Sequence, residues 1–199
     1  DEAVAANNDP DFINNLVRPI NAQNGDLLPV SAYKGYEDGA WEQGTAAYEK
    51  RGVSAFVPAW DAENCIQCNK CAFVCPHAAI RPFLLTDEEA AKAPAGMKIQ
   101  QGKAVFKEYK FALSVSVLDC TGCGNCADVC PSKEKALIMK PLGTQEAEQA
   151  NFDYLNTHVG YKENVQNKFG NLKNAQFAQP LFEFSGACAG CGETPYIKT

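Results

Sequence analysis

Ten cysteines dominate the chemistry that this 199-residue sequence could perform. Eight of them form two runs of equal spacing, Cys65-Ile-Gln-Cys68-Asn-Lys-Cys71-Ala-Phe-Val-Cys75-Pro76 and Cys120-Thr-Gly-Cys123-Gly-Asn-Cys126-Ala-Asp-Val-Cys130-Pro131. Cysteines separated by two residues can bind neighbouring irons of one small cluster, and the amides between them can donate hydrogen bonds to sulfur. The proline after the fourth cysteine lacks an N–H and fixes φ, so the chain turns away once that ligand is placed. Each run therefore predicts iron-sulfur ligands.

The spacing CxxCxxCxxxCP is typical of bacterial ferredoxins, in which three cysteines of a run bind one 4Fe-4S cluster and the fourth binds the other. The predicted ligands are Cys65, Cys68, Cys71 and Cys130 for the first cluster, and Cys120, Cys123, Cys126 and Cys75 for the second. We expect Gly122 and Gly124 to let the backbone approach the second cluster closely. The first run has Gln67 and Asn69 instead. This difference predicts unequal reduction potentials, but not their order.

Zinc and disulfide bonds are the alternatives that these cysteines leave open. Paired CxxC sequences also bind zinc, and a cysteine-rich chain can be a secreted disulfide framework. Zinc gives no reason for two equal runs that both end in Cys-Pro. We therefore rank iron-sulfur binding first, zinc second and disulfide bonds last.

The composition is that of a globular protein. Hydrophobic residues make up 46% and charged residues 21% of the chain, which are ordinary values. No apolar run approaches the ~18 residues of a membrane span, and no signal sequence begins the chain. The net charge of −6, with no stripe of lysines, argues against nucleic-acid binding. We expect no membrane partner and a cytoplasmic or otherwise reducing location, such as a hydrogenosome, where thiols stay reduced.

The repeat predicts an α+β fold of the ferredoxin-like type, a pseudo-two-fold βαββαβ unit over residues 53–142 with irregular extensions at both ends. We expect an edge strand at 53–60 and a strand at 79–85. The second of these is expected to pair with 136–139, which follows the second run in the same way. Alternating apolar residues predict another strand within 104–118.

Helix signals stand outside and between the runs. Thr86-Asp-Glu-Glu89 matches a capping box and predicts a short helix through residue 93. Further helices are expected at 9–17, ended by Pro19, at 144–156 and at 171–177. We interpret the insertion between the runs as structural packing; the alternative is that its lysines dock an acidic electron-transfer partner. These lysines are Lys92, Lys98, Lys103, Lys107 and Lys110.

Two further groups of residues are candidates for the surroundings of the clusters. His77 and His158 are expected on the solvated surface, although His77 directly follows a Cys-Pro pair and could instead tune its cluster through a hydrogen bond. The apolar side chains expected to keep water from the clusters are Phe73, Val74, Ile80, Leu118, Val129 and Ile138.

The remaining cysteine pair lies near the C-terminal end, in Phe184-Ser-Gly-Ala-Cys188-Ala-Gly-Cys191-Gly-Glu-Thr-Pro-Tyr196. Taken alone, one CxxC pair could be a redox dithiol or half of a metal site. Placed after the two runs, it makes the chain resemble the pyruvate:ferredoxin oxidoreductases, a family of 2-oxoacid oxidoreductases. Glu37-Asp-Gly-Ala-Trp41 and Pro58-Ala-Trp60-Asp-Ala-Glu-Asn-Cys65-Ile strengthen this resemblance.

The resemblance implies an enzyme that decarboxylates pyruvate on thiamine diphosphate and Mg²⁺, transfers the acetyl group to coenzyme A, and passes electrons through three 4Fe-4S clusters to ferredoxin or flavodoxin. By the same resemblance, Cys188 and Cys191 would be two ligands of the cluster nearest the thiamine, and Glu193 would face that cofactor. The other ligands would lie in the rest of a parent polypeptide, so this chain alone would not be catalytic. The family also implies a homodimer.

The implied domain organisation has four parts. Residues 1–52 would be a connecting segment that packs on the parent enzyme, 53–142 the two-cluster domain, 143–183 a linker with short helices, and 184–199 the start of the thiamine-binding domain. Two other classes stay open: a free-standing two-cluster ferredoxin that carries electrons, and a sibling enzyme such as pyruvate:NADP oxidoreductase. The extra cysteine pair disfavours the first, while only a substrate pocket would separate the siblings.

Overall fold

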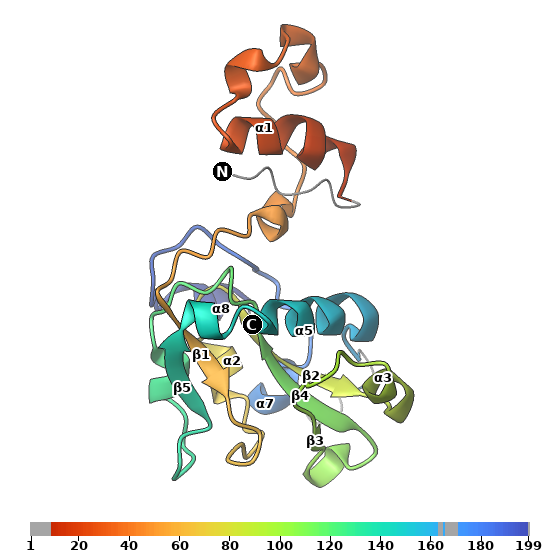
Figure 1. Cartoon of the computed structure of the whole chain (residues 1–199), viewed down its shortest axis with the longest axis vertical. Helices are drawn as coiled ribbons and strands as arrows, with labels where there is room; N and C mark the ends of the chain where they lie inside the picture. Colours follow the sequence, from red (N-terminus) through yellow and green to blue (C-terminus); the bar gives the residue numbers. More distant parts are fainter. Residues whose placement is uncertain (1–8, 163–164, 166–170, 199) are drawn as a thin grey trace. The chain divides into compact units, whose positions relative to one another are not determined.

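The computed structural model of the chain describes residues 9–162, 165 and 171–198. The chain divides into two compact units, Asp1–Glu49 and Lys50–Thr199, and the second contains every cysteine. Figure 1 labels the helices and strands. No helix within the described ranges is long and apolar enough to cross a membrane.

The first unit opens with a helix that continues past Pro19. A π-helical turn, Ile13–Val17, leads directly into α1, Arg18–Asn21. The expected helix end at Pro19 is therefore wrong. This proline directly follows the π-helical turn, at the second residue of α1, and it lacks the N–H that any other residue would donate within the continuous helix.

The second unit contains two small antiparallel sheets. Its strands are β1 (Phe56–Trp60), β2 (Ile80–Leu85), β3 (Gln100–Gln101), β4 (Lys110–Val115) and β5 (Leu137–Pro141). Strand β1 pairs with β5, and β4 lies between β2 and β3. The register sets Pro58 opposite Met139 in the first sheet and Pro82 opposite Leu113 in the second.

The expected pairing of 79–85 with 136–139 is wrong. Strand β2 pairs with β4, which precedes the second run, and β5 pairs with β1, which precedes the first run. The pseudo-two-fold axis exchanges β1 with β4 and β2 with β5, so each pair joins a strand of one half to a strand of the other. The order β1-α2-β2-β4-α4-β5 nevertheless confirms the predicted α+β ferredoxin-like unit.

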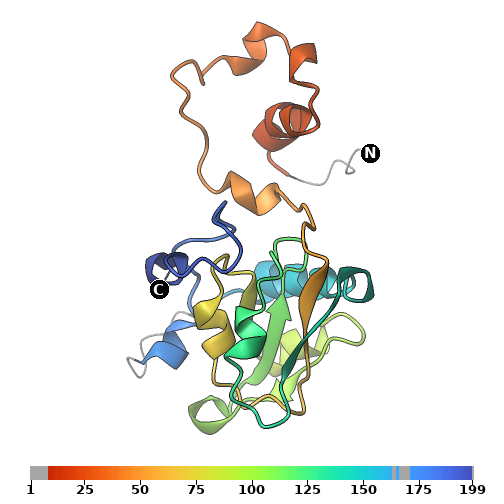
Figure 2. The same ribbon diagram turned by 90° about the vertical axis from the view of Figure 1, so that its left-hand side faces the viewer.

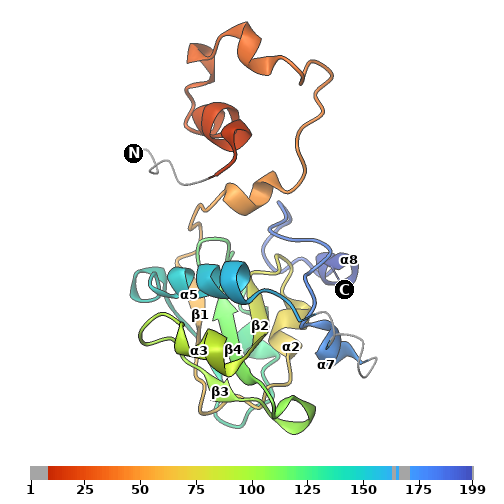
Figure 3. The same ribbon diagram turned by 90° about the vertical axis from the view of Figure 1, so that its right-hand side faces the viewer.

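Short helices complete this unit. They are α2 (Lys70–Val74), α3 (Asp87–Ala91), α4 (Asn125–Asp128), α5 (Glu148–Tyr154), α7 (Leu172–Ala175) and α8 (Thr194–Lys198). Each cysteine run supplies one of two neighbouring helices, α2 and α4, which Figure 2 shows side by side. Figure 3 shows α5 across the other side of β2 and β4. The second sheet thus separates the cysteine runs from α5.

Both faces of β2 and β4 are buried. The apolar alternation in 104–118 extends beyond β4 because Phe106 and Val117, on either side of this strand, are buried as well. Phe111, Leu113 and Val115 belong to the core that also contains buried cysteines. Ala112 faces a second core, with Leu155 from the π-helical continuation of α5, Leu155–Val159. The helix expected at 144–156 is thus confirmed in type, but it begins later than expected, at Glu148, and runs to Val159.

The insertion between β2 and β4 packs on the unit itself. The capping box is confirmed: Thr86 Oγ1 accepts from the Glu89 N–H (3.2 Å), and the Thr86 N–H donates to Glu89 Oε2 (2.7 Å). Lys98 Nζ donates to the carbonyl of Trp60 at 2.5 Å, and Lys103 Nζ to that of Cys65 at 2.9 Å. These bonds support the packing interpretation of the insertion.

Gly122 is required by close packing against the segment at the start of β1. Its φ is +68°, and a Cβ built on it would lie 2.0 Å from Ser54 Oγ and 2.8 Å from the Phe56 carbonyl oxygen. Gly124 has φ +82° but nothing within 4 Å of its Cβ position. We therefore expect Gly122→Ala to lower the melting temperature strongly.

The matched control for that prediction is the exposed Gly96, which has φ +85° and nothing within 4 Å of its Cβ position. Gly96→Ala should cost only the left-handed strain of about 1–2 kcal/mol. Thermal unfolding followed by circular dichroism compares the two variants. Equal melting temperatures would contradict the packing role assigned to Gly122.

Candidate metal centre

The structure gathers the eight cysteines of the two runs into two groups of four. One pocket is lined by Cys65, Cys68, Cys71 and Cys130. A second pocket is lined by Cys75, Cys120, Cys123 and Cys126. In both groups the fourth cysteine of a run joins the first three of the other, as the motif predicts. The space free of atoms, including the open mouth, is about 340 Å³ in the first pocket and about 380 Å³ in the second.

The two runs share one backbone conformation although their sequences differ. Gln67 and Asn69 have φ of 58° and 60°, and the corresponding Gly122 and Gly124 have 68° and 82°. Gln67 and Asn69 thus adopt the same left-handed backbone as the two glycines of the second run. Side chains compensate in the first run: Gln67 Nε2 donates to the Gln101 carbonyl, and Asn69 Nδ2 to the Lys173 carbonyl, at 2.9 and 3.0 Å.

Backbone N–H groups point at cysteine sulfurs, as the spacing predicts. The Gln67 N–H donates to Cys65 Sγ and the Gly122 N–H to Cys120 Sγ, both at 3.4 Å. The Ala79 N–H donates to Cys75 Sγ at 3.3 Å. Such bonds spread negative charge away from a thiolate or a cluster sulfur. The donor set and its amides therefore fit a 4Fe-4S cluster in each pocket.

Burial controls the protonation of these thiols. Together with a smaller contribution from neighbouring cysteines, it raises the pKa of Cys120 to about 11 and that of Cys71 well above its usual value. Without metal these two thiols are consequently protonated at neutral pH, so iron binding to them must release protons. At Cys130, burial acts in the same direction, but hydrogen bonds from the N–H groups of Ser132 and Ala136 outweigh it and lower the pKa.

The apolar wall of the pockets differs from the expected set. Of the six expected residues only Ile80 lines either pocket, and Ile138 is 52% exposed. The observed apolar lining comes from alternate strand positions: Phe111, Leu113 and Leu137 in the first pocket, and Pro58, Ile80, Val115 and Met139 in the second. Phe73 and Val74 belong to α2 and line neither pocket, whereas the strands supply most of the wall.

His77 is buried, so its expected place on the surface is wrong. Its side chain lines the second pocket, and its Nδ1 lies 3.0 Å from the Ser185 carbonyl oxygen. The Phe184 N–H also donates to the His77 carbonyl at 2.9 Å. His77 therefore fixes the start of the C-terminal cysteine segment onto the Cys75-Pro76 turn. His158, as expected, is exposed.

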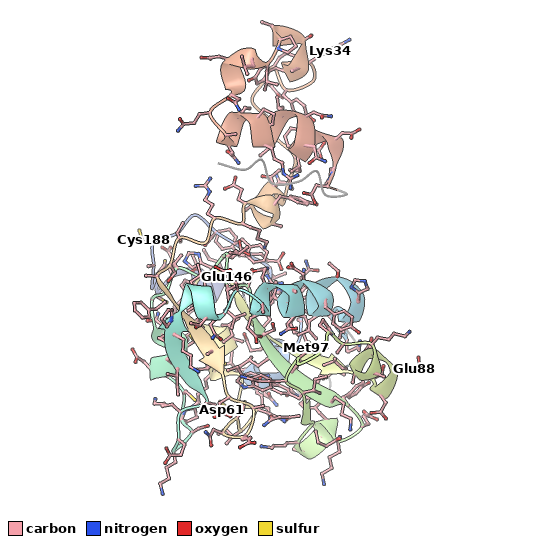
Figure 4. The ribbon with its side chains drawn as sticks, in the orientation of Figure 1. Lys34, Asp61, Glu88, Met97, Glu146 and Cys188 are labelled. Atoms are coloured by element: carbon pink, nitrogen blue, oxygen red, sulfur yellow. The ribbon has the colours of Figure 1, made fainter. Side chains whose placement is uncertain are left out.

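The Cys188–Cys191 loop lies beside the second group of four cysteines. A Cβ built on Gly190 would lie 3.5 Å from Cys123 Cβ. Cys188 is exposed, and its side chain lies at the outer edge of the unit in Figure 4. The N–H groups of Thr194 and Glu193 hydrogen-bond to Cys191 and lower its pKa. The Glu193 side chain is exposed and lines neither cysteine pocket.

Arg81 is the charged residue of this region that sequence reasoning missed. It is 2% exposed, its Nε donates to the Ala78 carbonyl at 2.6 Å, and its Nη1 forms an ion pair with Glu183 at 2.6 Å. The only sequence signal was an arginine inside an apolar strand, which does not reveal its partners.

Comparison with known proteins identifies two family models in this chain. Residues 61–133 match a 4Fe-4S dicluster domain, and residues 1–54 match the EKR domain, a domain of unknown function. The chain therefore carries a dicluster domain over the region that holds both pockets.

Curated relatives match the chain along its whole length. It is 53% identical over 198 residues to the pyruvate-flavodoxin oxidoreductase of Enterobacter agglomerans and 52% identical over 203 residues to the pyruvate:ferredoxin oxidoreductase of Moorella thermoacetica. Each alignment covers 100% of this chain but only 17% of the relative. The pyruvate dehydrogenase [NADP(+)] of Cryptosporidium parvum is 46% identical over 94% of this chain and 10% of its own length. The chain carries a 4Fe-4S dicluster domain and is homologous to one segment of the pyruvate-flavodoxin and pyruvate:ferredoxin oxidoreductases.

Proposed function

We propose that this chain is the electron-relay segment of an enzyme that oxidises pyruvate with coenzyme A to acetyl-CoA and CO₂ and reduces ferredoxin or flavodoxin. The observation that carries the proposal is the pair of neighbouring four-cysteine pockets, with a further cysteine pair held against one of them. A 4Fe-4S cluster accepts and releases one electron at a time with little rearrangement. Two such clusters in the two pockets suit that task.

The ligands that we propose follow the pocket lining. Cys65, Cys68, Cys71 and Cys130 hold the first cluster, and Cys75, Cys120, Cys123 and Cys126 hold the second. Cys188 and Cys191 supply two ligands of a third cluster, whose other ligands lie outside this chain. The contact of Gly190 with Cys123 supports an order in which electrons reach the second cluster before the first.

The flavodoxin and ferredoxin acceptors follow from the names of the relatives, and the other cofactors and partners follow from the resemblance to the 2-oxoacid oxidoreductases; all of them belong to the proposal. Thiamine diphosphate, Mg²⁺ and coenzyme A would be bound by the parent enzyme, with Glu193 toward the thiamine and 184–199 as the start of its domain. The segment 1–52 would pack on the parent enzyme, 53–142 would be the two-cluster domain and 143–183 a linker; part of that linker lies outside the described residues. We also propose a homodimer in a reducing compartment.

The test uses the intact protein under anaerobic conditions. Pyruvate with coenzyme A should bleach the visible absorbance of the clusters and then reduce added flavodoxin or ferredoxin. Cys68→Ala, in the first group, should still allow bleaching but should block reduction of the acceptor. Cys123→Ala, in the second group, should block acceptor reduction as well, and it should also prevent electrons from reaching the first cluster. Full acceptor reduction by either variant would contradict the relay.

Parallel assays with different electron acceptors and different substrates distinguish the sibling enzymes. The relative from Cryptosporidium parvum is named for NADP⁺, so NADP⁺ is offered alongside flavodoxin and ferredoxin. Reduction of NADP⁺ alone would favour that sibling. Bleaching of the clusters by 2-oxoglutarate but not by pyruvate would identify a different 2-oxoacid as the substrate. Iron-loaded protein that no 2-oxoacid reduces, but that dithionite does, would favour the free-standing carrier.

A further inference from the structure

Near the end of each cysteine run, a lysine side chain donates hydrogen bonds to two equivalent backbone carbonyl groups. In the second run, Lys135 Nζ donates to the carbonyls of Ala127 and Cys130 at 3.2 and 2.8 Å. In the first run, Lys198 Nζ donates to the carbonyls of Ala72 and, at 2.8 Å, Cys75. Ala72 and Ala127 each follow the third cysteine of their run, and the other acceptor is in each case the fourth cysteine.

The two lysines come from different parts of the chain. Lys135 stands five positions after Cys130, on the tail of its own run. The first run continues as Pro76-His-Ala-Ala-Ile80 and offers no lysine there. Its lysine is supplied instead by α8, 123 positions away from Cys75 and a few residues after the Cys188–Cys191 pair. The pseudo-two-fold symmetry of the site is thus completed by the C-terminal segment.

Their surroundings differ as well. Lys135 is exposed, whereas Lys198 is 5% exposed. Burial, and to a lesser degree Arg81, lowers the pKa of Lys198 to about 8, while Cys75 and Cys71 act in the opposite direction. Glu183 pairs with Arg81, and no ion pair with Lys198 is present among the described residues. A buried positive charge without a carboxylate partner is costly unless a negative group lies nearby.

We propose that Lys198 supplies the buried positive charge that offsets the negative charge of the second cluster, at its ligand Cys75, and so raises that cluster's reduction potential. This inference rests on the proposed ligand sets. Adding an electron adds a negative charge, and a fixed cation close by in a poorly solvated site favours that step. Because Lys198 lies on the segment that carries Cys188 and Cys191, docking of that segment also completes the electrostatics of the second cluster.

The competing explanation is purely structural. Lys198 lies at the C-terminal end of α2, where a cation stabilises the last carbonyl groups of a helix. Both explanations expect loss of stability when the lysine is removed. Only the electrostatic one expects a change in the potential of a cluster that remains bound.

The experiment is a redox titration of the intact protein, purified anaerobically, followed by EPR. Lys198→Met removes the charge at similar length, Lys198→Gln keeps a donor without charge, and Lys198→Arg keeps the charge. We expect both neutral variants to lower the potential of one cluster by about 59 mV, which is a tenfold change in its ratio of reduced to oxidised form for one electron. Lys198→Arg should keep that cluster's potential close to the wild-type value, because the positive charge remains. The matched control, Lys135→Met, should shift a different cluster and by less, since water screens its charge.

The outcomes separate this inference from the function on which it rests. Unchanged potentials in either iron-loaded neutral variant would overturn the role of Lys198. Loss of iron from both neutral variants but not from Lys198→Arg would also overturn it, because it would assign a structural role. Wild-type protein without iron, or without a reduced-state EPR signal, would instead reject the relay itself.

Discussion

Cys75→Ala and Cys71→Ala are expected to damage different clusters, although the two cysteines lie on the same short segment around α2. Cys75 lines the pocket with Cys120, Cys123 and Cys126, whereas Cys71 lines the other. A missing thiolate leaves one iron without its protein ligand, so each single variant should lose at least one iron and the EPR signal of one intact 4Fe-4S cluster. The cluster in the other pocket should remain intact.

Double variants make this prediction independent of any spectral assignment. Cys75→Ala combined with Cys120→Ala should still damage only one cluster, because both side chains line one pocket. Cys75→Ala combined with Cys71→Ala should damage both. Iron content and EPR of dithionite-reduced protein supply the count. The crossed arrangement is wrong if the first combination damages both clusters and the second only one.

Arg81→Met is expected to cause the largest loss of stability away from the cysteines. Arg81, a residue of β2, is buried against the segment that carries Glu183 and Phe184, with its guanidinium 5.0 Å from the Phe184 ring and 5.3 Å from the Phe152 ring. Its removal leaves Glu183 partly buried without its cation and the Ala78 carbonyl without its donor. Breaking a buried ion pair by removing one partner typically costs about 3–5 kcal/mol.

The melting temperature of anaerobically purified protein measures this effect. Lys133→Met serves as the control, because Lys133 is exposed and surface substitutions usually change stability by only about 0.5 kcal/mol. Arg81→Met with Glu183→Gln should recover part of the loss, since no unpaired carboxylate remains. A melting temperature equal to that of Lys133→Met would contradict the assigned role of Arg81.

Local sequence signals predicted the parts of the site that are set by neighbours in the chain. The amide-to-sulfur hydrogen bonds at Cys65 and Cys120 join residues two positions apart, so spacing alone defines them. The capping box at Thr86 and Glu89 is equally local. The fold class followed from the repeat, because two equal runs with flanking strands fit one pseudo-symmetric unit.

Features set by distant segments were not predictable in the same way. The partner of β2 depends on how the two halves interlock, and alternation along 79–85 is compatible with either β4 or β5. Ile138 was expected inside because it is apolar, but it lies on the exposed side of β5 while Leu137 and Met139 line the pockets. A strand of five residues does not reveal which of its faces meets a partner.

The same limit explains His77 and Lys198. Each is an isolated polar residue in the sequence, and each becomes informative only because the C-terminal segment returns to the Cys75 turn. Sequence reasoning gave the first a surface position and assigned the second no role. Both now mark the place where the Cys188–Cys191 segment docks.

The most direct test of the electron-relay assignment is a metal and sulfide analysis of the anaerobically purified chain, with EPR before and after reduction by dithionite. Two filled pockets predict about eight irons and eight acid-labile sulfides per chain, and two interacting reduced clusters in the spectrum. Stoichiometric zinc in place of iron, without a reduced-state signal, would contradict the account.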